Sequence, residues 1–117
     1  MTDSSASTDS SASTDPSASY DYRAIDDIIH GRVRMAVMAY LSGADKAAFA
    51  DLKRQTAVTD GNLSANLRKL EDAGYVAIDK SFVDRRPMTR VTLTPQGREA
   101  WIAYLGNLEQ LLGLSQP

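Results

Sequence analysis

The feature that most constrains the fold is a change in the spacing of apolar residues at Gly74. Upstream of this glycine, leucines recur at the spacing of a helix, at Leu63, Leu67 and Leu70. Downstream the period drops to two, as in a half-buried strand, with Val76, Ile78, Lys80 and Phe82 alternating against Ala77, Asp79, Ser81 and Val83. Glycine commonly ends helices, because it adopts left-handed backbone angles without steric cost. The sequence therefore predicts a helix that ends at Gly74 and is followed at once by a strand.

Two further helices are expected before this one. Residues 25–41 carry apolar side chains at helical spacing up to the breaker pair Ser42 and Gly43, which predicts a first helix. Asp45 is expected to cap a second helix of about two turns. Thr59 is expected to cap the third, after a connection of about two or three residues.

A hairpin and a last helix are expected after Gly74. Residues 76–83 read as a strand, residues 84–87 as a polar turn and residues 90–94 as the returning strand. Thr94 followed by Pro95 is typical of a helix start, and the helix is expected to end near residue 113. The predicted fold is mainly α with a small β-hairpin, a winged helix-turn-helix.

The N-terminal segment has a different composition. Residues 2–19 contain three copies of a hexad, TDSSAS, TDSSAS and TDPSAS, with no side chain more apolar than alanine. Such a segment cannot offset its ordering entropy by burial. We expect residues 1–19 to be a disordered tail and residues 20–117 to form one domain.

Charge is unevenly distributed along the chain. The formal net charge is −2, but the tail contributes three aspartates and no basic residue. Residues 53–90 hold eight basic and five acidic residues, so this segment is basic. A localised basic surface of this kind suits a polyanionic partner.

Several chemistries lack the residues that they need. The chain has no cysteine, His30 is its one histidine, and no carboxylates stand at ligand spacing, so we expect no metal site. No serine has a base or acid near it in an expected ordered element, and no glycine-rich phosphate loop occurs. We therefore expect the protein to have no enzymatic activity and to bind no cofactor. No apolar run approaches the roughly 20 residues that are needed to cross a bilayer, and the N-terminus lacks the basic and apolar parts of a signal peptide. These features predict a cytoplasmic protein without a membrane partner.

Three segments carry a resemblance to a known family. The run TDGNLSANLRKLEDAGYV at residues 59–76 resembles the recognition helix and first wing strand of short winged-helix regulators related to the ArsR and MarR families. FVDRRPMT at 82–89 is similar to their arginine-rich wing tip, and LTPQG at 93–97 to the start of their final helix. The resemblance covers residues 25–112. It implies a homodimeric transcriptional regulator that binds double-stranded DNA. Thr56 and Ala57 stand where members often have glycine or a small turn residue, and the turn can accommodate them if their backbone angles remain negative.

The third helix supplies candidate DNA contacts. With its leucines buried, the face turned outward carries Asn62, Ala65 and Arg68 as base-reading candidates. Asn62 has the chemistry to pair with adenine, Ala65 to contact a thymine methyl group, and Arg68 to bind guanine or a phosphate. Members often carry a bulky basic residue or histidine where this chain has Ala65 and Asn66, which leaves most of the base reading to Asn62 and Arg68.

The remaining polar residues of this helix fit backbone contacts. Ser64, Asn66 and Lys69 suit positioning on phosphates, and Thr59 suits either a plain N-cap or a phosphate contact. The alternative is that these residues are the solvated side of an ordinary surface helix.

The expected wing tip holds Arg85 and Arg86, which nothing in the sequence would bury. Arginine gains from the negative potential of a narrow minor groove, so we expect minor-groove or phosphate contacts there. Asp84 would oppose phosphate unless it pairs with a neighbouring arginine. The alternative role is a turn that only increases solubility.

The last helix is apolar over a wider sector than one small domain absorbs. We expect it to pair with its counterpart and with the first helix of a second copy, through Trp101, Leu105, Leu108 and Leu112. The alternative is that this sector packs wholly within its own domain.

Two other functions remain open at this point. A winged-helix module can bind protein instead of DNA, in which case the arginines of the third helix and wing would not all be needed. A sensor with a small apolar pocket between the first and last helices is a third possibility, but no residue marks an effector.

Overall fold

A computed structural model of the chain describes residues 22–113. These residues fall into two compact units. The main unit comprises residues 26–105, and the small unit comprises residues 22–25 with residues 106–113. The predicted disordered tail, residues 1–19, lies outside the described residues.

Three helices form the base of the main unit. They are α1 (Arg32–Ala44), α2 (Phe49–Thr56) and α3 (Asp60–Asp72). Helix α1 packs against both α2 and α3. The core between them consists of apolar side chains that are fully or almost fully buried: Val37, Met38, Leu41, Leu52, Leu63, Leu67 and Leu70. The leucine pattern of the third helix is therefore confirmed as its buried side.

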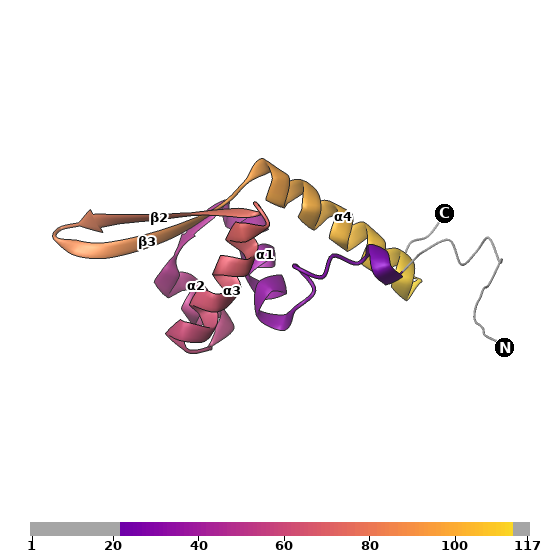
Figure 1. Ribbon diagram of the computed structural model, residues 1–117, viewed down its shortest axis with the longest axis horizontal. Coiled ribbons are helices and arrows are strands. Elements are labelled where there is room, and N and C mark those ends of the chain that lie inside the picture. The colour runs from indigo at the N-terminus through magenta and orange to yellow at the C-terminus, as the bar shows by residue number, and fades with distance from the viewer. Residues whose placement is uncertain (1–21, 114–117) are drawn as a thin grey trace. The chain divides into compact units, whose positions relative to one another are not determined.

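A three-stranded antiparallel sheet completes the main unit. Its strands are β1 (Lys46–Ala48), β2 (Val76–Val83) and β3 (Arg86–Leu93), in the order β1-β3-β2. Strands β2 and β3 form a long hairpin that extends beyond the helices α2 and α3 in Figure 1. The end of the hairpin nearest the helices is buried, at Val76, Val91 and Leu93. The predicted winged helix-turn-helix is confirmed.

Helix α1 differs from its prediction at both ends. It begins at Arg32, because the preceding residues form a turn in which the Asp26 carboxylate accepts hydrogen bonds from the N–H groups of Ile28 and Ile29. Ile29 is buried there without being helical. Helix α1 also continues through Gly43 and ends at Ala44, since its packed face outweighs the modest helix propensity of glycine.

The prediction that Asp45 caps the second helix is wrong. Asp45 is the C-cap of α1, with a φ of 67°, and its N–H donates to the carbonyl of Leu41. The three residues after it form β1, which the sequence analysis missed. Ala47 of β1 is buried and pairs with Val91 of β3, so strand pairing decides the structure of this short segment.

The connection between α2 and α3 has the predicted length of three residues, from Ala57 to Thr59. Ala57 has a φ of 54° and a ψ of 37°, so the condition of negative backbone angles is not met at this residue. Its N–H donates to the carbonyl of Lys53 at 2.8 Å, which ends α2. The left-handed angles are needed for this hydrogen bond, and alanine adopts them at a steric cost.

Both ends of α3 follow the prediction. The Thr59 hydroxyl accepts a hydrogen bond from the N–H of Asn62 at 3.1 Å, as an N-cap does. At the other end Gly74 has a φ of 84°, and the N–H of Tyr75 donates to the carbonyl of Leu70 at 2.9 Å. The chain thereby turns directly from α3 into β2.

Helix α4 (Pro95–Leu112) starts against this turn. Thr94 caps it by accepting from the N–H of Gly97 at 2.9 Å, and the Thr94 hydroxyl donates to the carbonyl of Gly74 at 2.7 Å. A Cβ atom at Gly97 would lie 2.0 Å from the carbonyl oxygen of Tyr75. Only glycine allows this close approach, so the start of α4 is fixed on the end of α3.

The first part of α4 packs within the main unit. Trp101 and Tyr104 are buried there, with stacked rings whose centroids are 5.6 Å apart. In the small unit, the 3₁₀ turn η2 (Tyr22–Ala24) accepts a hydrogen bond at the Ala24 carbonyl from the side chain of Asn107. Among the described residues, no helix has the length and apolar character required to cross a membrane.

Candidate functional site

The exposed face of α3 carries most of the predicted contact residues. Six of the seven named on or beside this helix are exposed: Thr59, Asn62, Ser64, Ala65, Arg68 and Lys69. The seventh, Asn66, is only half-buried and turns toward α1. The structure thus brings the predicted set onto one helix face, with Asn66 at its edge.

Asn66 belongs to a chain of hydrogen bonds along the flank of α3 that faces α1. Its Oδ1 accepts from Nη1 of Arg34 at 2.6 Å. Its Nδ2 donates to the carbonyl oxygen of Asn62 at 2.9 Å and to the side-chain oxygen of Asn62 at 2.8 Å. The predicted phosphate-contact role of Asn66 therefore competes with an internal structural role.

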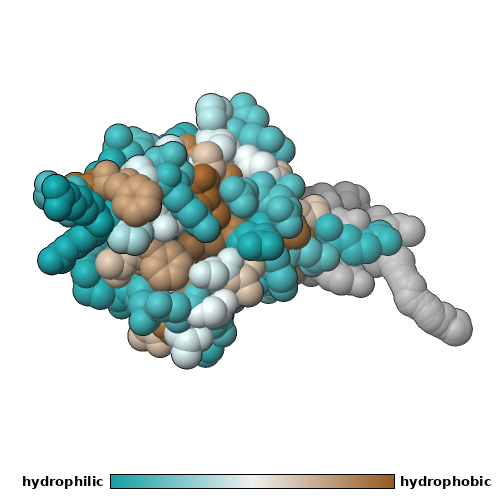
Figure 2. All heavy atoms as spheres, turned by 60° about the vertical axis from the view of Figure 1, so that its left-hand side comes forward, coloured by the Kyte–Doolittle hydropathy of each residue, from teal (hydrophilic) through white to brown (hydrophobic). Residues whose placement is uncertain are grey.

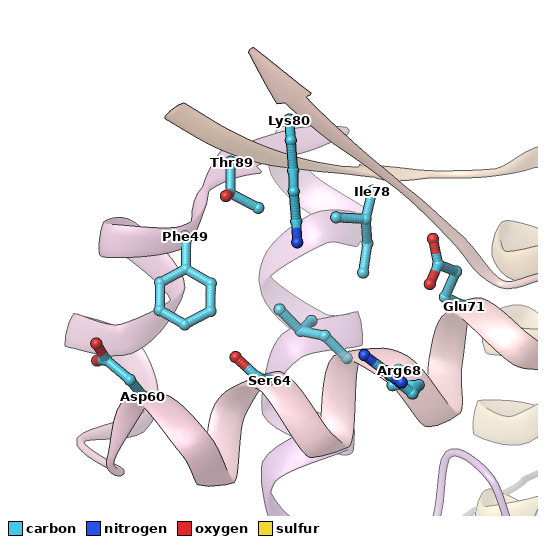
Figure 3. Close-up of a pocket in the computed structure, with 9 residues that line it drawn as sticks. Phe49, Asp60, Ser64, Arg68, Glu71, Ile78, Lys80 and Thr89 are labelled. Carbon is cyan, nitrogen blue, oxygen red and sulfur yellow. The ribbon is translucent and has the colours of Figure 1, made fainter. Parts of the chain in front are cut away.

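The opposite flank of α3 borders a cleft of about 550 Å³ between this helix and the hairpin. Figure 3 shows the lining residues, which come from α2, α3 and both hairpin strands: Phe49, Asp60, Ser64, Leu67, Arg68, Glu71, Ile78, Lys80 and Thr89. In Figure 2, hydrophobic atoms occupy the middle of the face seen there and hydrophilic side chains border them. The cleft lies between the helix and the wing. Three of its lining side chains are apolar, Phe49, Leu67 and Ile78, and the other six are polar.

Lys80 is a residue of this site that the sequence analysis did not name as a contact. It is exposed on β2, and in Figure 3 its side chain extends from the strand toward α3. The sequence pattern that could have identified it is the alternation of β2, because Lys80 follows Ile78 on the strand face that lines the cleft.

The wing tip is a tighter turn than predicted. Val83 pairs with Arg86, so only Asp84 and Arg85 lie between the strands, and Pro87 belongs to β3. Both turn residues have positive φ values, 51° and 67°. A two-residue hairpin turn with two positive φ angles favours asparagine and glycine, so arginine at the second position is held at a steric cost.

The side chains at the wing tip are open to solvent. Arg85 and Arg86 are exposed, and Phe82 is 75% exposed. Within residues 22–113, Asp84 forms no ion pair with the neighbouring arginines, so the pairing considered for it is not observed. Phe82 follows the same alternation as Val76 and Ile78, but it lies near the tip of the hairpin and is exposed.

The basic side chains divide into two groups. Lys53, Arg54 and Arg98 form ion pairs with Asp60, Asp51 and Asp45 respectively. In contrast, eight basic side chains have no hydrogen bond or ion pair within the described part of the chain: Arg32, Lys46, Arg68, Lys69, Lys80, Arg85, Arg86 and Arg90. Six of the eight are on α3 and the hairpin, and the other two, Arg32 and Lys46, are on α1 and β1. The charges of the six on α3 and the hairpin are free to meet an external anion.

The predicted dimer residues have different environments. Trp101 is 8% exposed and packs within the main unit, so little of its surface remains for a partner. Leu105 is 41% exposed in the main unit, and in the small unit Leu112 is 59% exposed and Leu108 is half-buried. Ile102, which belongs to the same broad apolar sector of the last helix, is 62% exposed.

Two tyrosines in the main unit have raised pKa values. The hydrogen bond from Tyr75 to the Asp26 carboxylate, with burial and the nearby negative charge, raises the pKa of Tyr75 to about 12. Burial raises the pKa of Tyr104 above its ordinary value. The Tyr104 hydroxyl lies 2.9 Å from Nδ1 of His30 and donates to the sulfur of Met35. The Tyr75 contact joins the turn before α1 to the connection between α3 and β2, and the Tyr104 contacts join α4 to α1 and to the exposed His30 before it.

Comparisons with known proteins agree with this architecture. Residues 33–112 match the family described as a winged helix DNA-binding domain. An uncharacterized protein from Methanocaldococcus jannaschii is 37% identical over 84 residues, which cover 72% of this chain and 91% of that protein. A solved structure of a transcriptional regulator homologue from Pyrococcus horikoshii is 31% identical, with a TM-score of 0.73, over 81% of this chain and 96% of that one.

The fold also occurs in more distant regulators. A MarR-like transcriptional regulator from Thermotoga maritima is 28% identical, with a TM-score of 0.51, over 68% of this chain and 56% of that chain. The regulator BldR from Sulfolobus solfataricus has the same fold at 21% identity, with a TM-score of 0.56, over 83% of this chain and 61% of that chain. The helix-turn-helix, the hairpin and the matched segment of 80 residues, 33 to 112, place this chain in the winged helix DNA-binding domain family, and its fold is that of solved transcriptional regulators.

Proposed function

We propose that the protein is a sequence-specific DNA-binding transcriptional regulator that acts as a homodimer and catalyses no reaction. The observation that carries this proposal is the group of unpaired basic side chains on α3 and the wing. Elsewhere in the main unit, Lys53, Arg54 and Arg98 form ion pairs with aspartates, and only Arg32 and Lys46 are unpaired among the described residues. Free positive charge concentrated on two projecting elements is what phosphate binding requires.

Helix α3 is the element that enters the major groove in this proposal. On its exposed face Ala65 has only a methyl group as its side chain, so a base edge can approach closely there, and Asn62 and Arg68 stand on either side of Ala65. Arg68 also lines the cleft toward the wing, so it reaches a base or the adjacent phosphate. Thr59, Ser64 and Lys69 contact the phosphate backbone, while Asn66 acts through Asn62.

The wing carries the second contact. Arg85 and Arg86 lie at the far end of the hairpin, and Lys80 lies between them and α3. With α3 in the major groove, the tip reaches the neighbouring minor groove or its phosphates. The steric cost of arginine at a positive φ supports a functional reason for that residue.

Dimerisation is proposed through the exposed apolar residues of α4. Leu105 and Ile102 are exposed in the main unit, and Leu112 in the small unit. A two-fold related copy would cover the same surface on both chains and present two α3 helices to half-sites about one DNA turn apart. Trp101 supports this surface from beneath.

The decisive experiment measures affinity for duplex DNA as a function of salt. Wild type should lose affinity steeply as salt rises, and replacing both Arg85 and Arg86 with alanine should reduce the slope of log Kd against log salt by about 2, at about 0.9 per phosphate contact. The control replaces Arg54 and Arg98, two paired arginines, with alanine and should leave the slope unchanged. A salt-insensitive complex, or equal effects of the two double variants, would refute the proposed contact.

The dimer is tested by sedimentation. Wild type should sediment as a dimer at micromolar concentration, and Leu105→Asp should shift it to monomer, because a charge cannot be buried unpaired at an apolar interface. Ala103→Asp introduces the same charge at another exposed position of α4 and should leave the dimer intact. A monomeric wild type would refute the dimer.

One observation favours a second candidate function, a domain that binds protein. Phe82 and Val83 are exposed beside the wing tip, at 75% and 42%, and exposed apolar residues frequently mark protein contacts. Such a complex would tolerate salt and would persist in the Arg85 and Arg86 double variant, so the experiment above separates the two functions.

A further inference from the structure

We propose that Arg34 fixes the orientation of the Asn62 side-chain amide, so that Asn62 offers hydrogen-bond donors to a base and reads acceptors. The inference rests on the proposed function and gives α3 a defined chemical preference. It makes Arg34, a residue of α1 outside the expected DNA-contacting face, a positioning residue for recognition.

The first step is the contact between Arg34 and Asn66. Nη1 of Arg34 donates to the side-chain oxygen of Asn66 at 2.6 Å. A guanidinium has donors and no acceptor, so Asn66 must turn its oxygen, and not its nitrogen, toward Arg34. Arg34 is itself held in place, because its Nε donates to the carbonyl of Ile28 in the turn before α1.

The second step carries this orientation to Asn62. With its oxygen on Arg34, Asn66 turns its NH₂ group toward the preceding turn of α3. There Nδ2 donates to the carbonyl oxygen of Asn62 at 2.9 Å and to the side-chain oxygen of Asn62 at 2.8 Å. If Asn62 were rotated to place its own NH₂ there, two donors would face each other. Asn62 therefore keeps its oxygen toward Asn66 and its NH₂ free.

The third step is the position of Asn62. It lies in the first turn of α3, is exposed, and has its backbone N–H bonded to the Thr59 hydroxyl at 3.1 Å. The N-terminal part of a recognition helix is the part that meets base edges. Both the backbone and the side chain of Asn62 are thus fixed before any DNA arrives.

The preference follows from the groups on the bases. In the major groove, guanine offers acceptors at N7 and O6 and thymine offers an acceptor at O4, whereas cytosine offers only the donor at N4. An Asn62 that presents donors favours guanine or thymine over cytosine. The two-bond contact with adenine needs the Asn62 oxygen to accept from N6 as well, and one of the two lone pairs of that oxygen already accepts from Asn66. The expected pairing of Asn62 with adenine therefore competes with the contact to Asn66, whereas its free NH₂ group favours acceptors.

The test inverts the orientation of the Asn62 side-chain amide by changing Asn66. First, selection from a random duplex library with wild type and Asn62→Ala identifies the base position whose preference depends on Asn62. At that position wild type should favour guanine or thymine over cytosine by about tenfold, the low end of what one well-placed contact discriminates. In Asn66→Asp, the carboxylate accepts from both Arg34 and Asn62, so Asn62 turns its oxygen outward. The preference should then move to cytosine or adenine.

Controls separate the orientation from stability and charge. The added charge of Asn66→Asp weakens binding to all duplexes alike, so the ratio between duplexes is the readout. Arg34→Met frees the Asn66 amide and should flatten the preference at this one position while leaving other positions unchanged. Thermal unfolding of each variant verifies that it is folded.

Each outcome is decisive. A ratio that Asn66→Asp and Arg34→Met leave unchanged overturns the inference, as does an Asn62→Ala variant that alters no position. Absence of any DNA binding by wild type overturns the proposed function as well. A readout without DNA distinguishes these failures: in wild type the side-chain NH₂ protons of Asn66 should exchange slowly with solvent, and Arg34→Met should accelerate their exchange severalfold.

Discussion

Helix α3 and the wing tip present the same kinds of side chain to solvent, but they hold them differently. On α3, Asn62 is fixed through its backbone by Thr59 and through its side chain by Asn66, above leucines that are fully or almost fully buried. At the wing tip, Arg85 and Arg86 have no side-chain partner among the described residues, and no apolar side chain beneath them is buried. One surface is rigid and the other is held only by strand pairing.

This difference corresponds to two kinds of recognition. Reading a base edge requires a donor or acceptor fixed within a fraction of an ångström, because hydrogen bonds are directional. Attraction to phosphate is long-ranged and tolerates movement of the charge. The rigid helix suits sequence discrimination, and the open wing suits affinity that is insensitive to sequence.

The largest effect is expected on the free energy of unfolding, when a side chain beneath α3 is compared with one at the wing tip. Leu67→Ala leaves a cavity beneath α3 and should lower the free energy of unfolding by about 2–5 kcal/mol. Phe82→Ala, which removes a larger but mostly exposed side chain, should change it by about 0.5 kcal/mol or less. Denaturant titration measures both. A comparable loss for Phe82→Ala would mean that the wing tip is packed after all.

The next effect concerns Tyr75, at the junction of α3 and the wing. Tyr75→Phe removes the hydrogen bond to Asp26 and should cost about 1–2 kcal/mol at neutral pH. Because the pKa of Tyr75 is raised to about 12 from its ordinary value near 10, the protonated form is favoured by folding. The stability that it adds is complete below pH 10 and is lost as pH rises from 10 to 12.

Unfolding curves of wild type and Tyr75→Phe across this range measure the effect. The two proteins should differ by a constant amount below pH 10 and converge above it, since the variant lacks only this titrating group. A difference that persists unchanged to pH 12 would contradict the role assigned to the hydrogen bond.

The elements with the clearest patterns were predictable from the sequence. The leucines of α3, the cap at Thr59, the glycine after the helix and the start of α4 at Pro95 all depend on interactions within a few residues, and the structure has each of them. The exposed contact residues of α3 followed from the same periodicity, because burying the leucines determines which side chains turn outward.

What could not be predicted depends on contacts between distant segments. Strand β1 exists because Ala47 pairs with Val91, a residue more than forty positions away in the sequence. The late start of α1 depends on Asp26, whose carboxylate also accepts from Tyr75. The hydrogen bond between Arg34 and Asn66 crosses from α1 to α3 and left no periodic signal. Propensity and spacing carry no information about such pairs.

The third prediction separates stability from affinity at the wing tip. Arg85 has a φ of 67°, where glycine is favoured, so Arg85→Gly should raise the free energy of unfolding by about 0.5–1 kcal/mol. The same change removes a phosphate contact and should weaken DNA binding severalfold, with a lower salt slope. Denaturant titration and binding at two salt concentrations measure the two effects. Retained affinity would show that the strained arginine does not contact DNA.

The smallest effect is expected in the turn between α2 and α3, where Ala57 has a φ of 54°. Ala57→Gly relieves the same kind of strain and should stabilise the fold by about 0.5 kcal/mol, since the greater flexibility of glycine in the unfolded chain offsets part of the gain. Because Ala57 lies outside both proposed DNA contacts, affinity and salt slope should remain those of wild type. Comparing this variant with Arg85→Gly separates the two sites of strain. If both variants stabilise the fold and only Arg85→Gly weakens DNA binding, the strained residue at the wing tip is the one that contacts DNA.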